Sequence, residues 1–157
     1  MLIGGAVLGF VIDLRLFKSF LFSPVFHIIT LILGLLFINL VFRASRNTGK
    51  LLARLGREGN VPRMETNKLV TEGIYACMRH PMHLGLLFFP LSVALIVGSL
   101  SFIIFIAPLE MLFMILMIKL FEEPEAIKKF SDDYINYMKK VPMFNFKIEC
   151  LQQLLKK

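Results

Sequence analysis

The amino-acid sequence predicts an all-α, polytopic membrane protein with about four transmembrane helices, and three observations lead to this fold class. First, 57% of the residues are hydrophobic and the mean hydropathy is +0.73, which is more than a soluble domain carries. Second, the apolar residues form runs that are long enough to cross a bilayer. Third, the basic residues stand in blocks beside those runs. The chain has 157 residues, so we expect a single domain over 1–157.

The first apolar segment, from Leu2 to Leu21, is the least regular one. Asp13, Arg15 and Lys18 interrupt it, so only its first half is cleanly apolar. The segment can cross the membrane if its basic side chains extend outward, or it can lie in the interface. We take it as a crossing. It lacks a basic start and a convincing cleavage site, so we read it as part of the mature protein.

The clearest crossing is Pro24–Phe42, a run of nineteen residues with only three polar side chains. At ~1.5 Å per residue, a helix of this length covers a hydrocarbon core of ~30 Å. Arg43 and Arg46 follow it directly. We therefore expect the membrane-spanning part to end at Phe42.

A second apolar region, Leu84–Phe121, is too long for one crossing. The stretch Gly98–Ser101 divides it, because glycine and serine favour a turn. We expect one helix over Leu84–Val97, kinked at Pro90, and another over Phe102–Phe121. Together they form a tight helical hairpin.

Two polar segments remain, 43–83 and 122–157, and four crossings would bring both to the same membrane face. Of the 18 lysines and arginines, 8 lie between Arg43 and Arg79 and 8 lie from Lys119 onward. Basic loops mark the cytoplasmic side, so we expect this loop and the C-terminus to be cytoplasmic. The tail beyond Val141 predicts an amphipathic helix on the membrane surface.

The net charge of +7 does not indicate a nucleic-acid partner, because the basic residues flank apolar spans and are mixed with acidic ones. Membrane lipids are the expected surroundings. The two cysteines, Cys77 and Cys150, do not make a disulfide framework. On a cytoplasmic face we expect both thiols to stay reduced.

The first candidate site begins where the hairpin enters the membrane. Arg79 and His80 precede Pro81, which suits the first turn of a helix, where unpaired N–H groups favour anions. Alternatively, Arg79 anchors to lipid phosphates and His80 caps the helix. Cys77, His80 and His83 are spaced like zinc ligands, but Pro81 breaks the helical face and no fourth ligand is evident. We expect no metal site here.

The second candidate site is an acidic cluster after the last membrane helix. Carboxylates oppose the dipole at the C-terminal end of a helix. A new helix over 126–138, started by Pro124, accounts for Glu125 and Glu123. It does not account for Glu122, which lies at membrane depth, where an ionisable residue is a functional candidate. Such a carboxylate suits a cationic ligand with an ammonium or sulfonium centre.

Three further features have two interpretations each. Tyr134 and Tyr137 share a helix face, either in the site or in an interfacial aromatic belt. Glu110 lies within the last span and could pair with His27 or Arg15. We interpret His27 as a packed histidine and leave the role of Glu110 open.

In this order, the motifs resemble the isoprenylcysteine carboxyl methyltransferase and phospholipid methyltransferase superfamily. That pattern has Gly-x-Tyr, then Arg-His-Pro-x-Tyr-x-Gly entering a membrane helix, a helical hairpin, Glu-Glu, Phe-Gly-x-x-Tyr-x-x-Tyr and Val-Pro. The matching residues here are Gly73-Ile74-Tyr75, Arg79-His80-Pro81-Met82-His83-Leu84-Gly85, Glu122-Glu123, Phe130-Ser131, Tyr134, Tyr137 and Val141-Pro142. The resemblance covers about 60–144, the expected catalytic core.

The resemblance implies methyl transfer from S-adenosyl-L-methionine to a lipid-like or prenylated amphiphile that enters from the bilayer. It also implies that the polar loop and the C-terminal segment close over the cofactor. Carried over residue by residue, the cofactor-binding residues are Asn67, Lys68, Leu69, Val70, Tyr75, His80, Pro81, Met82, His83, Glu122 and Glu123. A carboxylate acceptor needs no general base. For an amine or a thiol, His83 and Tyr137 are candidate bases.

This chain departs from the pattern in three places. His83 replaces the usual tyrosine and Ser131 the usual glycine. Isoprenylcysteine methyltransferases also have an arginine about one turn before the paired glutamates, associated with the substrate carboxylate. Here Met117, Ile118 and Lys119 occupy that stretch, and Lys119 offers a point charge without the bidentate fork of arginine. The acceptor therefore stays open between a carboxylate, a thiol and an amine.

Two other functions fit part of this pattern. Sterol-type reductases share the Arg-His-Pro hairpin layout and use NADPH, but they are usually longer and carry a different acidic motif. A non-enzymatic lipid-binding membrane protein accounts for the basic residues, but it gives no reason for Glu122 at membrane depth. The sequence does not indicate the oligomeric state.

Overall fold

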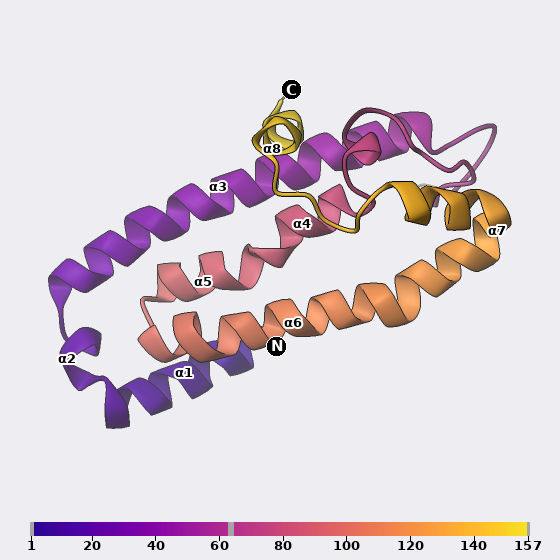
Figure 1. Cartoon of the computed structure of the whole chain (residues 1–157). Helices are drawn as coiled ribbons and strands as arrows, with labels where there is room; N and C mark the ends of the chain where they lie inside the picture. Colours follow the sequence, from indigo (N-terminus) through magenta and orange to yellow (C-terminus); the bar gives the residue numbers. More distant parts are fainter. Residues whose placement is uncertain (1, 63–64, 157) are drawn as a thin grey trace. The chain divides into compact units, whose positions relative to one another are not determined.

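The structure is a computed structural model that describes residues 2–62 and 65–156. These residues form helices and no strands, which confirms the all-α class (Figure 1). The α-helices are α1 (Leu2–Leu16), α2 (Lys18–Leu21), α3 (Pro24–Leu55), α4 (Pro81–Leu87), α5 (Phe89–Val97), α6 (Ala107–Met117), α7 (Glu123–Lys140) and α8 (Ile148–Leu155). A 3₁₀ turn covers Gly73–Ala76, and π-helical turns cover Phe102–Ile106 and Ile118–Glu122.

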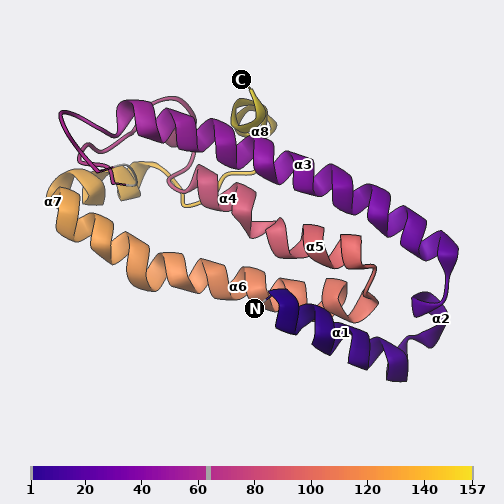
Figure 2. The same cartoon turned by 180° about the vertical axis from the view of Figure 1, so that it is seen from behind.

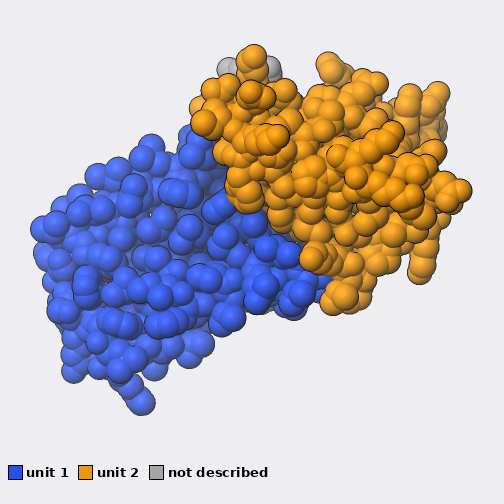
Figure 3. Space-filling model, in the orientation of Figure 1, with its two compact units in different colours: residues 1–41, 87–117 blue, residues 42–86, 118–157 orange. Residues whose placement is uncertain are grey.

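The chain forms two compact units, coloured separately in Figure 3. Unit 1 comprises residues 1–41 and 87–117, and unit 2 comprises residues 42–86 and 118–157. Helix α3 therefore contributes to both units, while the polar motifs of the sequence fall in unit 2. The prediction of a single domain stays a prediction.

Within the described residues, two helical stretches are long and apolar enough to cross a membrane, namely Pro24–Leu55 and Phe102–Lys140. Many apolar side chains of α3 are exposed, among them Ile28, Leu35 and Leu36, each more than half exposed. Such a surface suits lipid and not water. The apolar stretch Pro81–Val97 and α1 are shorter, so the number of four crossings stays a prediction.

Glycines let the helices of unit 1 approach closely. A Cβ atom built on Gly9 of α1 would lie 2.6 Å from Ser99 Oγ, and one built on Gly34 of α3 would lie 2.8 Å from the backbone nitrogen of Ile96. Both cartoon views show α1 beside the start of the last long helix (Figures 1 and 2). Small residues at such contacts are typical of helices that pack within a membrane.

Asp13, which interrupts the first apolar segment, is buried in unit 1. Its Oδ1 accepts hydrogen bonds from the backbone N–H of Ser101 at 2.9 Å and from the Ser101 hydroxyl. The acidic side chain therefore joins the end of α1 to the turn of the hairpin. Its other carboxylate oxygen has no hydrogen-bond partner among the residues that the structure describes.

The hairpin itself matches the prediction. The turn begins at Gly98, whose φ of 69° is a left-handed conformation that glycine adopts without strain. The first arm is broken at Phe88, just before Pro90, which confirms the predicted kink. His27 packs beside this turn in unit 1, with its Nε2 2.7 Å from the carbonyl oxygen of Leu21, so it is a packed histidine as predicted.

Two helices run further than predicted. Helix α3 continues past Phe42 to Leu55, because residues 43–55 are rich in helix formers and bury Ala44 and Thr48 on one face. Helix α7 begins at Glu123, directly after the π-helical turn, and not at 126. The backbone of Ser131 interrupts α7, with φ 50° and ψ −129°.

The prediction that both cysteines stay reduced is wrong. Cys77 and Cys150 form a disulfide across 73 residues of sequence, with their Cα atoms 5.9 Å apart. Helix α8 buries Cys150 and Leu154 on one face and lies beside the second half of α3, where the Asn47 side chain donates to the Lys156 carbonyl at 2.9 Å. Counting cysteines could not reveal this proximity, because it depends on where α8 folds back. The predicted C-terminal helix itself is present.

Candidate active site

The motif residues of the sequence surround one cavity of about 210 Å³ in unit 2. Its walls come from the end of α3, the 3₁₀ turn and the loop before it, the start of α4, the end of the second π-helical turn and one face of α7. The lining residues are Leu52, Thr66, Lys68, Leu69, Val70, Tyr75, Arg79, His80, Pro81, Met82, His83, Glu122, Ala126, Phe130, Tyr134 and Tyr137.

The segment after α7 fixes the backbone of the Arg-His-Pro motif. Arg79 N–H donates to the Pro142 carbonyl at 2.9 Å, and His80 N–H donates to the Met143 carbonyl at 3.2 Å. Pro81 then begins α4, where a proline fits the first helical turn. Pro142 of the Val-Pro motif and the following Met143 thus provide the backbone acceptors that hold Arg79 and His80 in place.

Arg79 holds the acidic end of the site in place. Its guanidinium forms an ion pair with Glu123 Oε1 at 2.5 Å, and each side chain is only 10% exposed. The same guanidinium donates to the carbonyl oxygens of Met138 and Val141. With its charge used in this way, Arg79 is not a lipid-phosphate anchor, and that interpretation of the sequence is wrong.

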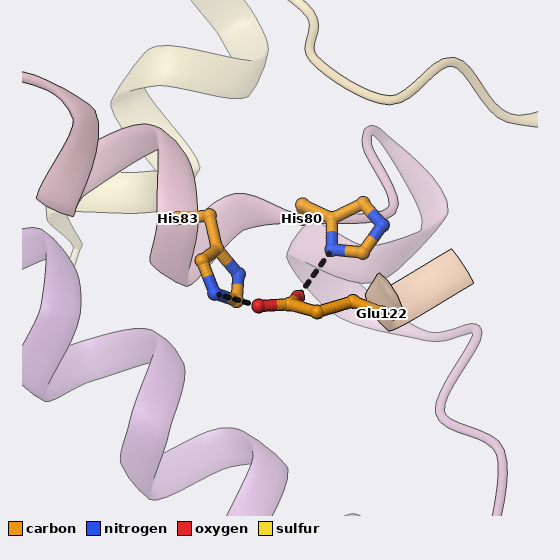
Figure 4. A group of neighbouring side chains, drawn as sticks. All are labelled: His80, His83 and Glu122. Atoms are coloured by element: carbon orange, nitrogen blue, oxygen red, sulfur yellow. Dashed lines mark ion pairs between the residues drawn. The ribbon is translucent and has the colours of Figure 1, made fainter. Parts of the chain in front are cut away.

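The carboxylate of Glu122 lies between two imidazole rings (Figure 4). Its Oε1 is 2.9 Å from His83 Nε2, and its Oε2 is 3.7 Å from His80 Nδ1. The histidines stand at the entrance to α4, and Glu122 ends the π-helical turn of the opposite segment. π-helical turns are rare in proteins, and where they occur they often mark functional sites.

His80 sits in a largely buried position. Burial lowers the pKa of His80 from its ordinary value, and the neighbouring His83 lowers it further, while the carboxylates of Glu122 and Glu123 act in the opposite direction. The net direction is downward. At neutral pH His80 is therefore a neutral imidazole that can accept as well as donate a hydrogen bond.

Three tyrosines form the aromatic side of the cavity. The hydroxyl of Tyr137 donates to the backbone carbonyl of Tyr75, and that of Tyr134 lies 3.5 Å from His80 Nε2. Burial raises the pKa of Tyr75 to about 12, so this phenol stays protonated. Tyr134 and Tyr137 are 5% and 7% exposed, so they belong to the interior of unit 2 and not to an exposed aromatic belt.

Most of the predicted site residues line this cavity. They are Lys68, Leu69, Val70, Tyr75, His80, Pro81, Met82, His83, Glu122 and Tyr137. Three others lie outside the lining. Asn67 exchanges hydrogen bonds with the backbone of Glu58, Glu123 pairs with Arg79, and Lys119 is exposed on the π-helical turn.

The sequence did not assign six lining residues to the site. They are Leu52, Thr66, Arg79, Ala126, Phe130 and Tyr134. Phe130 and Tyr134 carried a signal, because both belong to the Phe-x-x-x-Tyr-x-x-Tyr motif. Leu52 carried none, since it reaches the cavity only through the continuation of α3 that the sequence did not predict.

Comparison with known proteins places these motifs in context. A family model described as phospholipid methyltransferase matches residues 22–133. The chain is also 31% identical, over 153 residues, to a protein of Schizosaccharomyces pombe named protein-S-isoprenylcysteine O-methyltransferase. That alignment covers 90% of this chain and 60% of the relative, so the chain spans less than two thirds of the relative's length. No solved structure matches significantly.

Proposed function

This chain belongs to the phospholipid methyltransferase family, and we propose from that premise that it transfers a methyl group from S-adenosylmethionine to a lipid-like or prenylated acceptor. One observation carries the proposal. The same cavity is lined by residues of the Arg-His-Pro motif and by Glu122 of the Glu-Glu motif. In the sequence, the helical hairpin separates these two motifs. The family match and the relative both favour methyl transfer over the NADPH-reductase alternative.

The lining of the cavity fits a cofactor that combines a positive centre with a flat aromatic base. The Glu122 side chain is 42% exposed and offers a negative charge at the opening. Leu69, Val70 and Phe130 provide the apolar surface that a stacked base requires. The volume of about 210 Å³ is below the ~300 Å³ of the smallest usual ligand pockets, so the cavity as it stands encloses only part of such a ligand.

When bound, S-adenosylmethionine supplies a methyl group on a positively charged sulfonium, which an acceptor takes by in-line displacement. The role we propose for Glu122 is to attract and orient that positive charge. The buried tyrosines and the apolar lining exclude water, which strengthens the electrostatic interactions within the site. Catalysis then rests mainly on positioning.

The proposed roles of the remaining predicted residues follow from their places. His83 contacts Glu122 at the cavity and is the candidate base for an amine or a thiol acceptor. The Tyr137 hydroxyl donates a hydrogen bond to the Tyr75 carbonyl, which favours a positioning role for Tyr137. Asn67, Glu123 and Lys119 would reach a bound cofactor or acceptor only after local rearrangement.

We further propose that the protein crosses the membrane four times, with the polar loop and the C-terminus on the cytoplasmic face. Two long apolar stretches and the family support an integral membrane protein. The basic blocks support the orientation. The Cys77–Cys150 disulfide argues against the cytoplasmic orientation, because the cytosol normally keeps thiols reduced. An acceptor that enters from the bilayer is the partner such an arrangement implies.

The experiment that tests the proposal is calorimetric titration of S-adenosylhomocysteine into the detergent-purified full chain. We expect micromolar-range binding by the wild type and at least a tenfold loss for Glu122→Gln. The matched control is Glu125→Gln, because Glu125 is exposed, lies three residues away and does not line the cavity. Its affinity should equal that of the wild type.

A folded wild type that fails to bind in detergent and in lipid nanodiscs would overturn the methyltransferase proposal. Equal losses for both glutamate variants would overturn the role of Glu122 alone. If binding is established, a screen of prenylated carboxylates, thiols and amines with radiolabelled methyl donor identifies the acceptor class.

A further inference from the structure

We propose that His80, His83 and Glu122 form a binding site for a divalent transition metal of the zinc class. One donor atom from each residue lies within 4.8 Å of the other two. The sequence interpretation considered zinc and rejected it, because Pro81 separates the two histidines and no further ligand was evident. The third ligand comes instead from a residue about forty positions away in the sequence.

The donor atoms are spaced close to what a tetrahedral ion requires. Metal–ligand distances of ~2.0–2.2 Å put neighbouring donors about 3.3 Å apart in a tetrahedral zinc site. The two oxygens of the Glu122 carboxylate each face one imidazole, with Oε1 2.9 Å from His83 Nε2 and Oε2 3.7 Å from His80 Nδ1, one distance on each side of that value.

The types of ligand also favour zinc over magnesium or calcium. Imidazole nitrogens suit zinc and its neighbours in the first transition row, whereas magnesium and calcium take oxygen ligands. Two histidines and a glutamate are a known catalytic zinc set, which leaves a fourth position open. Both cysteines are in the disulfide, so no free thiol competes for the ion.

The surroundings of His80 support the same assignment. Its Nδ1 faces Glu122, while its Nε2 lies 3.5 Å from Glu123 Oε1. A histidine ligand typically directs its second ring nitrogen to a carboxylate, which fixes the orientation of the ring. Glu123 is itself held by Arg79, so this outer carboxylate is well positioned.

The site depends on His83, where this chain departs from the family pattern. The related methyltransferase motif has a tyrosine where this chain has His83, and a phenol does not replace an imidazole as a zinc ligand at neutral pH. If the proposed function holds, the metal and the methyl donor compete, because both use Glu122. Free zinc would then inhibit this enzyme.

The first test measures metal binding alone, with the disulfide-intact full chain in detergent. Zinc is titrated calorimetrically, and cobalt replaces it to report the ligand geometry through its visible absorption. We expect one equivalent to bind the wild type, and at least a tenfold weaker affinity for His83→Tyr and for Glu122→Gln. The control is His27→Gln, since His27 lies in unit 1 and outside the site.

The thermal melting of each variant shows whether it is folded. No binding by the wild type, or equal affinities for the folded wild type, His83→Tyr and Glu122→Gln, would overturn the metal site. The metal site would also be overturned if His27→Gln weakened zinc binding as much as His83→Tyr and Glu122→Gln do.

The second test adds S-adenosylhomocysteine before zinc. If zinc and S-adenosylhomocysteine compete for Glu122, a saturating concentration of S-adenosylhomocysteine should weaken zinc binding to the wild type several-fold. Unaltered zinc binding to nucleoside-saturated protein would overturn competition for Glu122. Protein that binds zinc but no nucleoside at all would sink the proposed methyl transfer and leave the metal site standing.

Discussion

The two units of this protein are stabilised in different ways. In unit 1, glycines on α1 and α3 let the backbones approach closely, and one buried acid, Asp13, joins α1 to the hairpin turn. In unit 2, an arginine–glutamate pair, side-chain contacts to backbone carbonyls and a disulfide hold the segments together. We therefore expect larger side chains at the glycines to destabilise unit 1, and the removal of a buried charge to destabilise unit 2.

The comparison of the two units predicts the largest loss of stability for Arg79→Met. Removing one partner leaves Glu123 buried without its counter-charge, which typically costs about 3–5 kcal/mol. We expect this loss in the free energy of unfolding, measured by denaturant titration in detergent. The double variant Arg79→Met with Glu123→Met should recover part of it. Equal losses for the single and double variants would contradict the charge-based account of unit 2.

A smaller effect is expected for Gly34→Ala in unit 1. The new Cβ atom would meet the backbone nitrogen of Ile96 at 2.8 Å, and overpacking of this kind costs about 1–3 kcal/mol. Gly4→Ala is the matched control, because nothing lies within 4 Å of a Cβ there. That control should be neutral or slightly stabilising. If both variants melt at the wild-type temperature, close backbone approach is not what stabilises unit 1.

The smallest expected effect is a gain in stability, for Ser131→Gly in α7. At φ 50° and ψ −129° the serine occupies a region that glycine adopts freely, and relieving such strain is worth about 1 kcal/mol. Asp132→Gly, at a helical neighbour, should instead lose about 0.3 kcal/mol in the free energy of unfolding, because glycine is a slightly poorer helix former than aspartate. Thermal melting compares the two variants directly. A destabilised Ser131→Gly would show that the serine itself stabilises the interruption.

The features that the sequence predicted correctly are local ones. The turn at Gly98 and the break before Pro90 follow from the backbone preferences of single residues. The order of the motifs predicted most of the residues that line the cavity, although their binding roles stay predictions.

The features that were missed depend on contacts between distant segments. The full length of α3 depends on the side chains that Ala44 and Thr48 pack against, and no periodicity in the sequence marks its end clearly. The pairing of Arg79 with Glu123, and of Cys77 with Cys150, requires knowing how the chain returns after α7. Each residue alone has an ordinary surface interpretation.

The disulfide has a consequence for the chain as a covalent object. It closes residues 77–150 into a ring that includes α4, α5, α6 and α7. A protease that cuts once inside this ring, for example in the hairpin turn, opens the ring without releasing a fragment. The nicked protein should migrate as one species on a denaturing gel without reductant, and as two when the bond is reduced.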